Sequence, residues 1–167
     1  MTTPFAITGY EISLFLHITA VMVGFGATFA EAIAAPVAAR MDPRHLPYVH
    51  RLQIAINSRL ATPALVVVLA TGIYQVVDGD WEFGDVWISG SFAIIIVVGG
   101  LLGGYFMPTD RRLEAMASEE VAAAGPTGKV TMSEAYQQAA RTEGIVGAVV
   151  GVLLVVAVFL MVVKPGV

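Results

Sequence analysis

Polar and small side chains line one face of the first long apolar segment of the chain. At 100° per residue, the members of this stripe fall within about 40° of one line: Tyr10, Ser13, His17, Gly24, Thr28 and Glu31. Lipid offers such groups no hydrogen-bond partner, so the stripe predicts a face turned toward a bundle interior or a water-filled cavity. Any chemistry of the chain is expected along this face.

His17 supports three interpretations, and its residue type alone does not choose between them. It could ligate the iron of a haem, because imidazole is a common axial ligand and an apolar bundle suits a porphyrin. It could form a proton path with Glu31, because ionisable side chains within a span often mark such paths. It could instead make only an interhelical hydrogen bond that fixes packing, with partners among Thr71, Gln75, Ser89 and Ser91.

Further site residues are expected at both ends of the stripe. If His17 binds a cofactor or metal ion, its neighbours at the same end of the bundle are expected to be Tyr10, Ser13 and Gln75. At the other end, Glu31 and Arg59 lie at about the same depth, which predicts a buried ion pair unless Arg59 extends to the interface. His45 and His50 follow no metal-ligand spacing and are interpreted as part of a solvated basic connection.

Four apolar runs supply the helices that must position these groups. They cover residues 12–35, 60–77, 86–107 and 145–163, and a helix needs about 20 residues to cross the hydrocarbon core. Hydrophobic residues make up 57% of the chain and charged residues only 13%. We therefore expect an all-α integral membrane four-helix bundle in the lipid bilayer, with residues 1–167 forming a single domain.

The distribution of basic residues predicts how the bundle is oriented. Eight of the nine Lys and Arg residues lie between the first and second runs or between the third and fourth. The positive-inside rule then places both connections in the cytoplasm and both termini outside, in a membrane of the bacterial inner type. Residues 109–124 and 131–144 are polar and are expected to extend the third and fourth helices as a cytoplasmic helical hairpin.

Composition excludes several classes of function. The net charge of −4 and the pI near 5.2 argue against a nucleic-acid partner, which would require a basic face. The sequence contains no Cys, so thiolate catalysis, disulfides and Cys-bound iron–sulfur clusters are excluded.

Small residues on the third and fourth helices predict close helix packing. The G-x-x-x-G spacings allow backbones to approach without a hydrophobic driving force, and they involve Gly99, Gly100, Gly103, Gly104, Gly144, Gly147 and Gly151. These faces are expected to hold the chain's own helices together, and the alternative is a homodimer through the same glycines.

Two segments of the chain carry a family resemblance. The segments "LFLHITAVMVGFGATFAEAIAAP" and "SRLATPALVVVLATGIY" resemble the CopD/HemJ-like superfamily of small membrane proteins, and particularly its predicted four-helix integral membrane proteins. HemJ-type members are haem-binding protoporphyrinogen oxidases in which a first-helix His and a third-helix Lys matter. The resemblance implies haem b at His17. The third apolar run contains no Lys, which argues against the HemJ-type oxidase activity.

The leading prediction is therefore a membrane protein that binds haem b or a porphyrin through His17 and has a redox role. If it is an enzyme, it would be a haem-dependent membrane oxidoreductase with a redox partner. A non-catalytic accessory subunit and a small proton-linked transporter are the alternatives.

Overall fold

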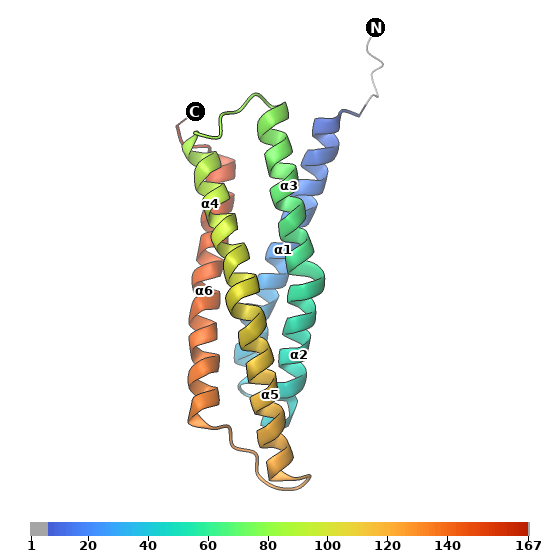
Figure 1. Ribbon diagram of the computed structural model, residues 1–167, viewed down its shortest axis with the longest axis vertical. Helices are drawn as coiled ribbons and strands as arrows, with labels where there is room; N and C mark the ends of the chain where they lie inside the picture. Colours follow the sequence, from blue (N-terminus) through green and yellow to red (C-terminus); the bar gives the residue numbers. More distant parts are fainter. Residues whose placement is uncertain (1–6, 167) are drawn as a thin grey trace.

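The computed structural model describes residues 7–166, which form one elongated bundle of helices (Figure 1). Four of its helical stretches are long and apolar enough to cross a membrane. The elements in chain order are α1 (Gly9–Ala38), η1 (Pro43–His45), α2 (Leu46–Ile56), η2 (Asn57–Ala61), α3 (Thr62–Asp78), α4 (Val86–Leu101), η3 (Leu102–Phe106), α5 (Met107–Ala124) and α6 (Glu134–Val163). The expected all-α membrane bundle is confirmed, while its orientation in the membrane stays a prediction.

Each of the two middle spans is one continuous helix interrupted by a π-helical turn. The turns η2 and η3 lie directly before Pro63 and Pro108, which lack the N–H that would bond the carbonyl four residues earlier. The backbone shifts to five-residue bonds instead, from Thr62 N to Asn57 O and from Met107 N to Leu102 O. The helix therefore accommodates Pro63 by a π turn.

The helices pack chiefly in pairs. α1 lies against α3, α4 lies against α6, and α2 lies against α5. Gly24 allows a close approach of α1 and α3, because a Cβ at this position would lie 3.1 Å from the Cβ of Ala64. The start of α1 and the end of α6 lie at the same end of the bundle as the turn between α3 and α4 (Figure 1).

The opposite end of the bundle has its own small core. α5 continues α4 and η3 as far as Ala124, and α6 begins at Glu134 with Ser133 accepting a hydrogen bond from the backbone N–H of Tyr136. The connecting segment packs its apolar side chains against both helices, and this core contains Leu113, Ala117, Val130, Met132 and Tyr136. It fixes the position of Tyr136 beside α2.

The expectation that the glycine faces hold the chain's own helices together is wrong for most of α4 and η3. A Cβ at Gly99 would lie 2.8 Å from Leu65, but a Cβ at Gly100, Gly103 or Gly104 would have no neighbour within 4 Å. The reason is that α4 turns its large side chains, such as Ile95 and Val98, toward the core. The three glycines lie on another face.

Gly128 is a site where a side chain is sterically excluded. A Cβ there would lie 2.0 Å from the carbonyl oxygen of Ala124, a backbone atom that cannot move aside easily. We expect Gly128→Ala to lower the free energy of unfolding by about 1–3 kcal/mol, as overpacking does. Thermal unfolding in detergent would measure this, with Gly84→Ala as the control because a Cβ at Gly84 has no neighbour within 4 Å. Equal melting temperatures for the two variants would contradict the steric explanation.

Candidate functional site

The N-terminal half of the α1 stripe forms a compact hydrogen-bonded group with α3. Ser13 and His17 are each 7% exposed. The Nδ1 of His17 lies 2.9 Å from Oγ1 of Thr71, and the Thr71 hydroxyl donates to the carbonyl of Val67 over 2.6 Å. Since Thr71 has only one hydroxyl hydrogen, Nδ1–H of His17 must be the donor between them. Gln75 donates to Ser13, so these groups satisfy one another.

A cavity of about 930 Å³ lies further along α1, in the middle of the bundle. Its walls include every buried residue of the main apolar core: Ala20, Ala64, Val68, Ile95, Val98, Val150 and Leu154. Two of these seven residues are alanines, and Gly24 and Gly147 also line the space, so the facing helices leave it unfilled. This volume lies within the range typical of small-molecule sites, about 300–1,000 Å³.

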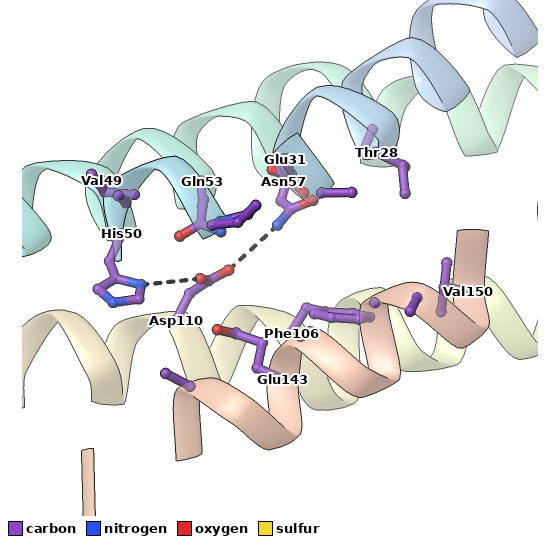
Figure 2. A pocket seen from close by; sticks show the side chains of 18 of the residues that line it. Thr28, Glu31, Val49, His50, Gln53, Asn57, Phe106, Asp110, Glu143 and Val150 are labelled. Carbon is purple, nitrogen blue, oxygen red and sulfur yellow. Dashed lines mark hydrogen bonds and ion pairs between the residues drawn. The ribbon is translucent and has the colours of Figure 1, made fainter. Parts of the chain in front are cut away.

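The cavity wall also has a polar region, beyond the apolar core. Figure 2 shows the side chains there turned toward one another, with the carboxylate of Asp110 between His50 and Asn57. We call this group the polar cluster, and its members are Glu31 from α1, His50 and Gln53 from α2, Asn57 from η2, Asp110 from α5 and Glu143 from α6.

His50 and Asp110 form the centre of the polar cluster. Nδ1 of His50 lies 3.6 Å from Oδ1 of Asp110, and Nε2 of His50 lies 2.7 Å from the Tyr136 hydroxyl. The other oxygen of Asp110 accepts a hydrogen bond of 3.4 Å from the amide of Asn57. His50 is 5% exposed and Asp110 is 2% exposed, so both are removed from water.

Five of the six residues of the polar cluster have one buried side-chain atom without a hydrogen-bond partner within the described chain. Buried polar groups are normally satisfied, and leaving one unpaired costs about 1–3 kcal/mol. Six buried side-chain N or O atoms in residues 7–166 have no partner, and five of them belong to the cluster. They are Glu31 Oε1, His50 Nδ1, Gln53 Oε1, Asp110 Oδ1 and Glu143 Oε1. Their convergence on one cavity indicates a site for a ligand that supplies the missing partners.

The residues predicted from sequence divide between two places. Ser13, His17 and Gln75 form the hydrogen-bonded group on α1 and α3, with Tyr10 nearby on α1, and His17 is not among the residues that line the large cavity. Glu31 belongs to the polar cluster, 14 positions further along the same helix. The two groups are therefore separated by about 21 Å along α1.

The structure differs from the expected ion pair and from the interpretation of His50. Arg59 is exposed, and within residues 7–166 it makes no ion pair with Glu31. The reason is that the η2 turn buries Asn57 and Ala61 and leaves Arg59 on the outer side. His50 is buried, and it was missed because the basic residues around it suggested solvent. The spacing of His50, Gln53 and Asn57 on one helical face was the available signal.

The comparisons with known proteins agree with the membrane architecture. A family model described as "Predicted integral membrane protein (DUF2269)" matches residues 11–165. The chain belongs to this family. The match includes nearly all of the four helices that are long and apolar enough to span a membrane. The resemblance to the wider CopD/HemJ-like superfamily stays a prediction. No curated protein and no solved structure matches the chain.

The hydrogen bond between His17 and Thr71 generates a stability prediction. Thr71→Val keeps the shape of the side chain but leaves the buried Nδ1–H of His17 without an acceptor. We expect the free energy of unfolding to fall by about 0.6–1.7 kcal/mol, the range measured for interhelical hydrogen bonds in membranes. Thermal unfolding in detergent would test this, with Thr62→Val as the control on the same helix because Thr62 is exposed. If both variants melt like the unchanged protein, the bond does not contribute to stability.

Proposed function

We propose that this integral membrane protein binds an apolar or amphipathic molecule in its central cavity. The observation that carries the proposal is a space of about 930 Å³ whose walls include both the apolar core and the polar cluster. Apolar walls favour an apolar occupant over water, because walls that face a void lose about 24 cal/mol per Å³ of contact energy. An acyl chain, an isoprenoid or a flat ring system would restore these contacts.

The polar cluster supports an amphipathic ligand rather than a purely apolar one. Three of its side chains are carboxylates, and the unpartnered atoms of Glu31, Gln53, Asp110 and Glu143 are oxygens, which accept hydrogen bonds. The complementary end of a ligand would therefore carry a positive charge or hydrogen-bond donors. Lys129 and Arg141 also line the cavity, but both are exposed.

Haem b, or another porphyrin, remains a specific form of this proposal, supported by the resemblance of the sequence and by the size of the cavity. The surroundings of His17 do not fit it as the ligand, because the imidazole packs against Gly72 near Phe92 and lines no space of porphyrin size. His50 is the histidine on the cavity wall. We therefore derive no redox step from an iron bound at His17.

The structure gives different support to the other functions and arrangements that the sequence predicts. A proton path from Glu31 to His17 gains no support from the cavity, which His17 does not line. A purely structural role as an accessory subunit is disfavoured, because the bundle has a large cavity in its core. The cytoplasmic position of the α5–α6 end rests on its basic residues. A homodimer would use the glycines of α4 and η3 at which a Cβ has no neighbour within 4 Å among residues 7–166.

A cavity-filling variant tests the proposed function. Gly147 lines the cavity, and a Cβ at this position would be no closer than 4.0 Å to Phe106, so Gly147→Leu can project into the space. The matched control is Gly100→Leu, on a helix face where a Cβ has no neighbour within 4 Å and away from the cavity wall. Each protein would be purified in detergent, extracted with organic solvent and examined by mass spectrometry and visible absorption.

We expect about one retained molecule per chain in the unchanged protein and in Gly100→Leu, and a several-fold loss in Gly147→Leu. A Soret band in the absorption spectrum would identify the molecule as a porphyrin or haem, and a lipid mass would identify an acyl or isoprenoid ligand. Equal retention by the two variants, or no retained molecule in any sample, would overturn the proposed function. Thermal unfolding of both variants shows whether a loss of retention reflects a loss of fold.

A further inference from the structure

Three side chains of the polar cluster place metal-ligating atoms close together. His50, Asp110 and Glu143 each offer one such atom, and these atoms all lie within 4.8 Å of one another. The residues come from α2, α5 and α6, so the site would join three helices that are far apart in sequence. Ligands about 2.1 Å from a tetrahedral ion are about 3.4 Å from each other. The distance of 3.6 Å between His50 Nδ1 and Asp110 Oδ1 is close to this value.

Each of the three residues also carries an atom without a partner. Nδ1 of His50, Oδ1 of Asp110 and Oε1 of Glu143 are buried and make no hydrogen bond. His50 and Asp110 are more than nine-tenths buried. An ion pair between a protonated His50 and Asp110 is the alternative, but at 3.6 Å the two atoms are too far apart for a hydrogen bond, and Glu143 would remain unpaired. A cation between the three residues satisfies all three atoms.

The opposite edges of His50 and Asp110 are held by neighbouring side chains. The Nε2 of His50 lies 2.7 Å from the Tyr136 hydroxyl, and with Nε2–H as donor the lone pair of Nδ1 faces the carboxylates. The second oxygen of Asp110 accepts from Asn57. Metal-binding histidines and carboxylates are commonly oriented by such outer hydrogen bonds, and removing one typically lowers metal affinity 10–100-fold.

We propose that His50, Asp110 and Glu143 bind a first-row divalent transition metal ion in the polar region of the cavity wall. One imidazole nitrogen and two carboxylate oxygens suit Zn²⁺, Mn²⁺, Fe²⁺ or Co²⁺, whereas sites for Ca²⁺ are built from oxygen alone. The two carboxylates balance the charge of the ion. Three protein ligands leave a coordination position on the cavity side, where Glu31 and Gln53 also present unpartnered oxygens. This inference goes beyond the proposed function, since it does not depend on the apolar occupant.

The test uses the full chain in detergent after removal of metals with EDTA. Co²⁺ is added while its visible ligand-field absorption is recorded, and Zn²⁺ is then added as a competitor and also measured by calorimetry. We expect one ion per chain, and a rise in the melting temperature with Zn²⁺ concentration because the ion binds only the folded state. The extraction experiment measures a retained molecule, whereas this titration measures an added ion, so the proposed function and the metal site are tested separately.

Substitutions of the proposed ligands decide the assignment. Asp110→Asn and His50→Gln are expected to weaken Zn²⁺ binding at least 100-fold, and Tyr136→Phe to weaken it 10–100-fold. The control substitutions are Glu119→Gln and His45→Gln, which change exposed residues of the same types and should stay within twofold of the unchanged protein.

The proposal is overturned if the unchanged protein shows no saturable binding of one ion, or if Asp110→Asn and His50→Gln keep its affinity. Glu143→Gln provides a further variant at a half-buried position if Asp110→Asn does not fold, and it is expected to show the same loss of binding. If Zn²⁺ raises the melting temperature of Asp110→Asn and of the unchanged protein equally, the ion binds elsewhere and the assignment is also wrong.

Discussion

Inside a bilayer there is no water to satisfy a polar side chain, and this constraint determines how the interior of the protein is organised. α1 shows two responses to it on one helix. Ser13 and His17 find partners on α3, where Thr71 and Gln75 complete their hydrogen bonds. Glu31 has an oxygen without a partner and faces the cavity with other side chains in the same condition. The hydrogen bonds of Ser13 and His17 are explained by helix packing. The unpartnered atoms around Glu31 require a bound partner that the described chain does not supply.

The two π turns place residues on the cavity wall. Pro63 and Pro108 each remove one backbone donor, and the chain accommodates the loss by an extra residue in the turn before them. The resulting change of helical phase buries Asn57 and Ala61 in η2, and it brings Leu102 and Phe106 of η3 to the cavity. π turns are frequent at functional sites for this reason, because they redirect side chains without ending the helix. The same rotation leaves Arg59 outside, away from Glu31.

Sequence reasoning recovered the parts of the structure that depend on local periodicity. The four spans and the inward face of α1 both follow from hydrophobicity and helical geometry. The partner of His17 was among the four candidates named from depth alone. The polar cluster was not predicted, because His50 and Asp110 are 60 residues apart and no local sequence pattern indicates that they are in contact. Basic neighbours such as Arg51 also made His50 resemble a solvent-exposed residue.

The sequence also does not determine which glycines lie at helix contacts. A G-x-x-x-G spacing states that two backbones could approach closely, but it does not state which helix provides the second backbone. Gly99 lies close to Leu65 of α3, whereas a Cβ at Gly100, next in sequence and rotated by about 100°, would have no neighbour within 4 Å in the part of the chain that the structure describes. Which glycine faces inward depends on how α4 is rotated about its axis, and the large core residues Ile95 and Val98 set that rotation.

The juxtaposition of an open apolar core and an unsatisfied polar cluster is costly for stability in two ways. Small residues at Ala20, Ala64 and Gly147 give up packing that larger side chains would provide. Burying Asp110 beside Glu143 brings two acidic groups together in a region of low dielectric constant. Replacing the small residues by larger apolar ones, and the acidic residues by apolar ones, would remove both costs. Natural proteins often keep such destabilising residues where function requires them. The cavity and the cluster adjoin one another, so a single bound species or a metal ion with an amphipathic ligand beside it would offset both costs at once.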